Sequence, residues 1–243
     1  MAKIAIDAGH YKYTDGKRCM KALDPNETRE WVLNDRVADA LGTYLQSAGH
    51  SILRVDDSTG NKEVTLSERC RRANEWGADY YISVHHNAGI GGGTGGGTVV
   101  FILPGTNGKT VQAQKAIYKH AIARGNLKGN RSNGTPTADF QVLRDTSMPA
   151  SLVECGFMDS ITDIKYILNP EWSKKIALGI AEGICEVYGG TVKETTTTPE
   201  KAPEKVSGKL YRVQVGAFSK KENAEALLTR LKSHGFDGYI KES

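Results

Sequence analysis

The sequence lacks a long apolar run. Near the N-terminus the apolar stretch Ile4-Ala5-Ile6 is soon interrupted by Asp7 and His10, which makes it too short for the core of a signal peptide. No later segment approaches the length of roughly 20 apolar residues that a membrane helix needs. We therefore predict a protein made in the cytoplasm without a signal peptide and without membrane insertion.

The sequence also lacks closely spaced cysteine pairs and a large excess of charge of one sign. The chain has four cysteines, far apart and without a C-x-x-C pair, so the sequence predicts neither a zinc ribbon nor a redox motif. The formal net charge is only +4, and basic residues are scattered among acidic ones. Nothing in this pattern calls for nucleic acid as a partner.

The apolar pattern predicts strands that alternate with helices. The continuous run Ile4-Ala5-Ile6 is typical of a strand covered on both faces. Such an alternation favours an α/β domain, a mostly parallel twisted sheet flanked by helices. The predicted strands are 3–7, 51–55, 79–84, 98–103, 140–143 and 150–153; the predicted helices are a helix from Thr28 that Gly49 stops, and 66–76, 110–124, 162–168 and 172–188.

Composition divides the chain into three parts. Residues 1–188 form one large predicted domain, and 189–207, rich in threonine, proline and charged residues, form a flexible linker. Residues 208–243 contain a strand pattern at 210–216, a helix at 221–231 and a second strand at 236–240. The tail is therefore predicted to be a small βαβ module, too small to hold a core comfortably alone.

Three residues of the kind that bind metals fall at the ends of predicted elements. His10 follows the first strand, Glu30 begins the first long helix, and His85 follows the strand 79–84. Because loops after the carboxyl ends of parallel strands meet at one crevice, these side chains could converge there. Two imidazoles and one carboxylate form the open zinc site of several metallohydrolases, in which zinc lowers the pKa of a water and polarises the scissile carbonyl.

Such a site also needs a general base. Glu154, at the end of the predicted strand 150–153, occupies another position on the same edge, and we interpret it as that base. A simpler interpretation exists for each residue: a histidine at a strand end is more often a packing or surface residue, and an acid in the first turn of a helix is favoured by the helix dipole alone.

Six segments resemble the motifs of one known family, in the family's order. They are Ile4–His10 (IDPGHGG-like), Thr28–Ala38 (a ligand helix), Leu66–Asn74 (L-x-x-R-x-x-x-A-N), Ser83–Ala88 (S-i-H-x-N-A), Phe140–Leu143 (f-x-V-L) and Met148–Phe157 (P-A-x-L-v-E-x-G-F). The family they resemble is the zinc N-acetylmuramoyl-L-alanine amidases of the Amidase_3 type, and the resemblance spans residues 1 to about 188, the predicted catalytic domain.

The resemblance implies a role for particular residues. It implies one Zn²⁺ held by His10, Glu30 and His85, with Glu154 as the catalytic acid and base. Glu30 is selected over Glu27 because the family glutamate stands four residues before the asparagine and eight before the alanine. His86 fills the variable position and is interpreted as a residue behind the ligands or facing solvent.

Some positions depart from the family pattern or stay unassigned. Ala8 stands where proline is usual and Tyr11 where glycine is usual, which bears on the shape of the loop. Two roles stay open for Asn87: it holds the loop, or it contacts the substrate.

The tail resembles one repeat of the SPOR-type wall-binding modules. Its Y-x-V-Q-v-G-A-F pattern makes Tyr211, Gln214 and Phe218 the candidate cell-wall-binding residues. A whole module of this kind has two βαβ halves and this chain shows one, so the sequence suggests a homodimer that completes the sheet.

The predicted function is zinc-dependent hydrolysis of the amide bond between N-acetylmuramic acid and L-alanine in peptidoglycan, the expected partner. Without a signal peptide, the protein would reach the wall after lysis or release. Two alternatives stay open: a zinc peptidase that cuts within the stem peptide, and a non-catalytic peptidoglycan-binding protein.

Overall fold

The computed structural model describes residues 1–130, 134–193, 215–233 and 239–240. The chain divides into two compact units, Met1–Thr195 and Thr196–Ser243. The predicted limits of the linker and the tail module fall within or beside residues outside the described part, so they remain predictions. Among the described residues, no helix is both long and apolar enough to cross a membrane.

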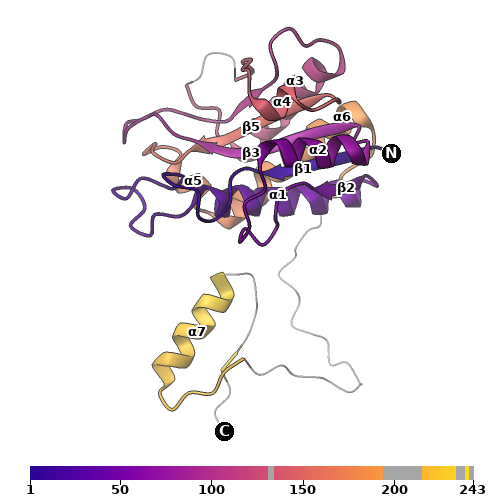
Figure 1. Cartoon of the computed structure of the whole chain (residues 1–243). Helices are drawn as coiled ribbons and strands as arrows, with labels where there is room; N and C mark the ends of the chain where they lie inside the picture. The colour runs from indigo at the N-terminus through magenta and orange to yellow at the C-terminus, as the bar shows by residue number, and fades with distance from the viewer. Residues whose placement is uncertain (131–133, 194–214, 234–238, 241–243) are drawn as a thin grey trace, which may run out of the picture. The chain divides into compact units, whose positions relative to one another are not determined.

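A five-stranded sheet forms the centre of the first unit (Figure 1). The strand order is β2-β1-β3-β5-β4; the first four are parallel and β4 pairs antiparallel with β5 at the edge. The predicted α/β fold with a mostly parallel sheet is confirmed. The strands are β1 (Lys3–Ala8), β2 (Ser51–Arg54), β3 (Tyr80–Asn87), β4 (Val99–Phe101) and β5 (Ala150–Phe157).

Helices cover both faces of this sheet. One face packs against α1 (Glu30–Ser47), α3 (Lys109–Gly125) and α6 (Pro170–Tyr188), and the other against α2 (Leu66–Trp76) and the short α4 (Gln141–Arg144). The short helix α5 (Ile164–Ile167) follows β5. Strand β1 shows the two-sided burial that its sequence predicts, because Ile4 and Ile6 enter one apolar cluster and Ala5 the other.

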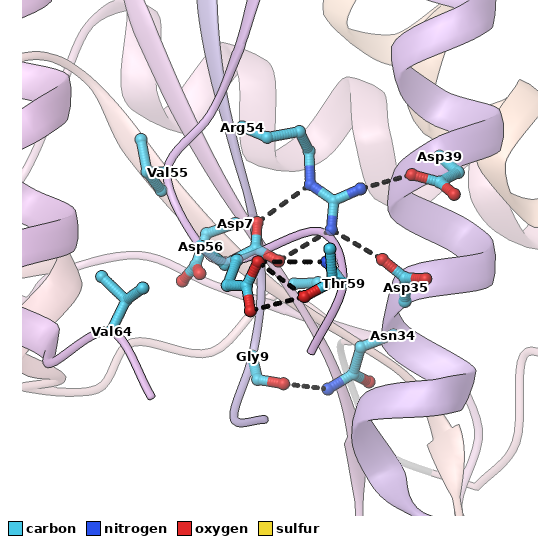
Figure 2. Close-up of polar contacts among 12 residues, drawn as sticks. Asp7, Gly9, Asn34, Asp35, Asp39, Arg54, Val55, Asp56, Thr59 and Val64 are labelled. Carbon is cyan, nitrogen blue, oxygen red and sulfur yellow. Dashed lines mark hydrogen bonds and ion pairs between the residues drawn. The ribbon is translucent and has the colours of Figure 1, made fainter. Parts of the chain in front are cut away.

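An ion-pair cluster ties α1 to the end of β2. Arg54 at the end of β2 donates to Asp35 on α1 and to Asp56 just beyond the strand, each at 2.7 Å, and also pairs with Asp39 (Figure 2). Because Asp35 and Asp39 are four residues apart, they lie on the same face of α1. The cluster fixes the helix whose first residue, Glu30, enters the functional site.

Two of the predicted element assignments are corrected by the structure. Residues 140–143 do not form a strand: Phe140 is extended, and Gln141–Arg144 form the helix α4. Both Val142 and Leu143 are buried, and an apolar run this short fits a helical turn as well as a strand. In addition, His85 and Glu154 lie within β3 and β5 rather than after them, because both strands run several residues further than predicted.

The described part of the second unit centres on α7 (Lys221–Ser233), where the sequence predicts a helix over 221–231. The strands predicted at 210–216 and 236–240 lie mostly outside the described residues. The βαβ arrangement of the tail therefore stays a prediction.

Candidate metal centre

The candidate site lies at the carboxyl edge of the parallel sheet. His10 follows β1, His85 lies near the end of the adjacent strand β3, and Glu30 is the first residue of α1. Seventy-five positions separate the two histidines in the chain, and the parallel pairing of β1 with β3 brings them together.

The three side chains converge on one another. His10 Nε2 lies 3.3 Å from Glu30 Oε2, and His85 Nδ1 lies 3.0 Å from Glu30 Oε1. The two imidazole rings meet edge to face, with centroids 5.0 Å apart. One ligand atom from each residue falls within 4.8 Å of the others. The carboxylate thus lies between two imidazoles and joins them.

Gly9 makes room for this arrangement. A Cβ atom at residue 9 would lie 2.1 Å from Cε1 of His85, so any side chain there would displace the imidazole. The next residue, His10, adopts a left-handed backbone conformation with φ of 67°, which is uncommon for a residue other than glycine. The surrounding structure must therefore hold this loop in place.

Arg69 on α2 anchors the backbone of the loop that carries His10. Arg69 is 2% exposed, and its guanidinium donates to the carbonyl oxygens of Ala8 and His10, each at 2.7 Å, and pairs with the buried carboxylate of Asp7. Burial alone would raise the pKa of Asp7, but the charges of Arg69 and His85 and the hydrogen bond from Ser83 outweigh it and lower that pKa. A buried ion pair therefore fixes the backbone that carries His10.

Asn34 and His86 support the site from the side of α1. The Asn34 amide nitrogen donates to the carbonyl of Gly9 at 3.0 Å (Figure 2) and to Glu30 Oε1 at 3.4 Å. Since that amide donates on one side, its oxygen accepts from Nδ1 of His86, 2.8 Å away. Burial lowers the pKa of His86 to about 3, so this ring is neutral. Of the two interpretations of His86, the position behind the ligands is supported, and exposure to solvent is wrong.

The charge of Glu30 is stabilised by its neighbours. Burial by itself would raise the pKa of Glu30, but the hydrogen bonds and charges of His10 and His85 lower it well below its usual range. The reciprocal effect raises the pKa of His85 even though burial opposes it. Glu30 is therefore an ionised carboxylate at 1% exposure, ready to bind a cation.

Glu154 lies on β5 directly opposite His85 of β3 in the strand register. Its Oε2 atom is buried without a hydrogen-bond partner. Burial raises the pKa of Glu154 to about 7; the charge of Glu30 adds to this rise, while those of His85 and Lys17 oppose it. A carboxyl group that titrates near neutrality is suited to accept and return a proton.

The donor set fits a divalent metal. Glu30 Oε2 is buried and has no hydrogen-bond partner, although His10 Nε2 is close by. Buried polar atoms are normally satisfied, so this oxygen has unused capacity to accept a bond. Two imidazole nitrogens and a carboxylate oxygen are the ligand types that zinc takes in hydrolases.

Part of this site could not be found by sequence reasoning. The position of Asp7 indicates that it needs a partner of opposite charge, because it is a charged residue at the end of a buried apolar strand. Nothing in the sequence identifies Arg69 as that partner. Lys17 gives no signal at all, because it is one of many lysines in polar loops.

Comparison with known proteins agrees with this geometry. A family profile described as N-acetylmuramoyl-L-alanine amidase matches residues 4–186. This chain belongs to the N-acetylmuramoyl-L-alanine amidase family. The predicted enzyme class, an amidase that acts on the cell wall, is thereby confirmed. A second profile, the SPOR domain, matches residues 196–242.

Two relatives align over nearly the whole chain. The sporulation-specific N-acetylmuramoyl-L-alanine amidase of Bacillus subtilis (strain 168) is 32% identical over 240 residues, which covers 99% of this chain and 84% of the relative. The endolysin of Bacillus phage SPP1 is 34% identical over 231 residues, covering 94% and 80% respectively. The resemblance to the amidase family that the motifs indicate is confirmed by these relatives.

Solved structures show the same fold. The catalytic domain of CwlV, the amidase of Bacillus (Paenibacillus) polymyxa var. colistinus, matches with a TM-score of 0.68 at 21% identity, covering 79% of this chain and all of that one. The amidase of Clostridium difficile 630 matches with a TM-score of 0.67 at 25% identity, covering 76% and 95%. The amidase fold therefore occupies the first unit of this chain.

The candidate wall-binding residues are only partly described. Tyr211 and Gln214 lie outside the described residues. Phe218 is described and 46% exposed, just before α7. Their role in wall binding stays a prediction.

Proposed function

We propose that this amidase hydrolyses the bond between N-acetylmuramic acid and L-alanine with one Zn²⁺ held by His10, Glu30 and His85, and with Glu154 as general base and acid. The observation that supports it is the convergence of three ligand atoms within 4.8 Å, one of them on a buried carboxylate with an unsatisfied oxygen. Glu154 lies opposite one of these ligands in the sheet.

The residues present supply most of what the reaction needs. When bound, zinc would act as a Lewis acid on the scissile carbonyl and make water a stronger nucleophile. Glu154 in its ionised form takes a proton from the attacking water. The neutral Glu154 then gives that proton to the leaving nitrogen as the carbon–nitrogen bond breaks.

Burial explains why Glu154 can act both as the general base and as the general acid. In water a glutamate is too acidic to return its proton readily near neutral pH. In the metal-free protein burial raises the pKa of Glu154 to about 7, so the environment of this side chain favours the protonated acid far more than water does. Asn34 and Arg69 hold Glu30 and the His10 loop in place while this proton moves.

Peptidoglycan is the proposed partner of the whole chain. The amidase profile covers the first unit and the SPOR profile the second, and both are consistent with a wall polymer as substrate and ligand. The homodimer suggested by the sequence has no support in the described part of the chain. Action after lysis or release likewise stays a prediction.

Digestion of purified cell walls tests the proposal. Wild-type protein should release intact stem peptides with a free L-alanine amine, as read by mass spectrometry, and should contain about one zinc per chain. His85→Ala should lose zinc and activity together, because two remaining ligands hold the metal weakly. His120→Ala, at a partly buried position between α3 and α6 outside the candidate site, is the matched control and should keep its zinc content and activity.

Other products would point to the alternatives. Stem peptides cut internally would show a peptidase instead of an amidase. Equal clearing of walls by wild type and His85→Ala would refute the metal site, and binding without any cleavage would favour a non-catalytic protein.

A further inference from the structure

Lys17 lies beside the candidate metal centre, and the proposed function gives it no role. Lys17 belongs to the loop between β1 and α1. Its Nζ atom lies 3.8 Å from Glu30 Oε2, the carboxylate oxygen that has no hydrogen-bond partner. At that separation the ammonium faces the site without being hydrogen-bonded to it.

The backbone of Lys17 is fixed although its side chain is 46% exposed. The main-chain N–H of Glu30 donates to the carbonyl of Lys17 at 3.0 Å, and Cys19 N–H donates to the carbonyl of Thr28 at 2.9 Å. A β-bridge between Arg18 and Arg29 completes a short antiparallel pairing. The start of the lysine side chain is thus tied to the same helix end that carries Glu30.

The charge of Lys17 also acts on Glu154. It is one of the groups that lower the pKa of this buried carboxyl, in opposition to burial. Lys17 is therefore close enough to Glu30 and Glu154 for its charge to act on both carboxyl groups. A substrate carbonyl bound between the proposed metal ligands and the proposed general base would lie within the same field.

The reaction develops negative charge at this place. Attack of water forms a carbon–oxygen bond and moves the carbonyl π electrons onto oxygen, while one water proton passes to Glu154. When the carbonyl re-forms, the carbon–nitrogen bond breaks; nitrogen keeps the electron pair and takes the proton from Glu154. The charged oxygen between these two steps is what an adjacent cation stabilises.

We propose that the Lys17 ammonium stabilises this oxyanion during amide hydrolysis. The inference rests on the proposed function, because it assigns a second stabilising charge to the same site. A divalent ion that engages Glu30 would release Lys17 from that carboxylate, and the four-carbon stem of the lysine leaves its ammonium free to move toward the substrate oxygen.

Kinetics of Lys17→Met on a soluble muramoyl-peptide fragment test the inference. We expect kcat to fall roughly 10- to 100-fold, below the full effect of a buried oxyanion donor because this side chain is partly exposed, with KM within about twofold of wild type. Lys17→Arg should keep a larger share of kcat than Lys17→Met. Lys21→Met, which removes the same charge from an exposed position on the same loop, is the matched control and should leave both constants unchanged.

Zinc affinity, measured by competition with a chelator, separates catalysis from structure. Because Lys17 and the metal are both positive, Lys17→Met should bind zinc at least as tightly as wild type. If Lys17 served only to hold Glu30 in place, this affinity would fall, and that result would overturn the inference. An unchanged kcat, or a rise in KM alone as expected for a substrate-anchoring charge, would overturn it as well.

Chemical rescue gives an independent readout. Lys17→Cys can be treated with 2-bromoethylamine, which restores an ammonium group on a side chain of nearly lysine length. The four natural cysteines are all buried, and burial raises their pKa values, for Cys19 to about 12, so the new thiol should react first. We expect kcat to recover in treated Lys17→Cys and to stay constant in treated wild type.

The proposed function and this inference can fail separately. If wild type and Glu154→Gln cleave the fragment equally, the proposed function fails. If Glu154→Gln is inactive and Lys17→Met is as active as wild type, only the inference on Lys17 fails.

Discussion

Replacing Glu154 by glutamine should stabilise the metal-free protein at alkaline pH while abolishing most catalysis. The residue is buried on β5, and glutamine keeps its shape but cannot ionise. A carboxylate kept only for structure would behave in the opposite way, because its removal would cost stability at neutral pH. The same substitution therefore tests the burial, the pKa and the catalytic role of this residue.

The magnitude follows from the raised pKa. Burial raises the pKa of Glu154 from an ordinary value of 4.5 to about 7. Folding therefore favours the protonated acid: the full stability is present below pH 4.5 and is lost as the pH rises through 7. A shift of about 2.5 pKa units corresponds to about 3 kcal/mol, of which roughly 2.5 kcal/mol is lost between pH 5 and pH 8.

Urea denaturation of chelator-treated protein between pH 5 and pH 8 measures this effect. All three tryptophans belong to the first unit, so their fluorescence reports unfolding of the amidase domain alone. The free energy of unfolding of Glu154→Gln minus that of wild type should rise by about 2.5 kcal/mol over this range. Titrating groups that do not interact with Glu154 are common to both proteins and cancel in the difference; His85, whose pKa the charge of Glu154 helps to raise, does not cancel fully.

A control and a second condition make the test specific. Glu63→Gln makes the same chemical change at an exposed position and should show no such rise. Added zinc should reduce the rise in the difference between Glu154→Gln and wild type, because a nearby cation favours the ionised form of Glu154, and the pH dependence of zinc binding to the two histidines is largely shared by both proteins. Turnover of Glu154→Gln should fall about a hundredfold or more with zinc content unchanged. Parallel pH profiles of wild type and Glu154→Gln would refute the reasoning.

Two further predictions concern the residues that hold the site. Arg69→Met should destabilise the protein by about 3–5 kcal/mol at pH 7, because it leaves the Asp7 carboxylate buried without its partner; a loss below about 1 kcal/mol in urea denaturation would contradict this. Gly9→Ala should fold but bind little zinc, because the added Cβ would meet the His85 ring at 2.1 Å; full zinc content by metal analysis would show that the loop can adjust.

Much of the fold followed from local chemistry. The apolar run Ile4-Ala5-Ile6 indicated a strand covered on both faces, and the helix predicted at 66–76 has the bounds of α2, where Thr65 caps the first turn and Gly77 ends the last in a left-handed conformation. These signals depend on residues near one another in the chain. The region 140–143 was assigned wrongly because four residues carry no periodicity that separates a strand from a helical turn.

The candidate ligands could also be named from the sequence, because His10, Glu30 and His85 stand in ordered motifs of a known family. The way in which these three side chains come together could not be predicted from the sequence. The passage of the His85 ring past Gly9 and the amide of Asn34 that joins Gly9 to Glu30 are contacts between segments from different elements. No local pattern encodes such contacts.

The sequence by itself determined which residue types this protein brings to the edge of its sheet. Only the tertiary structure decided their environment: it buried Glu154 enough to raise its pKa, placed Arg69 beneath the His10 loop, and set Lys17 beside Glu30. The physical reason is that desolvation and charge interactions depend on distance in space, whereas a sequence records distance along the chain.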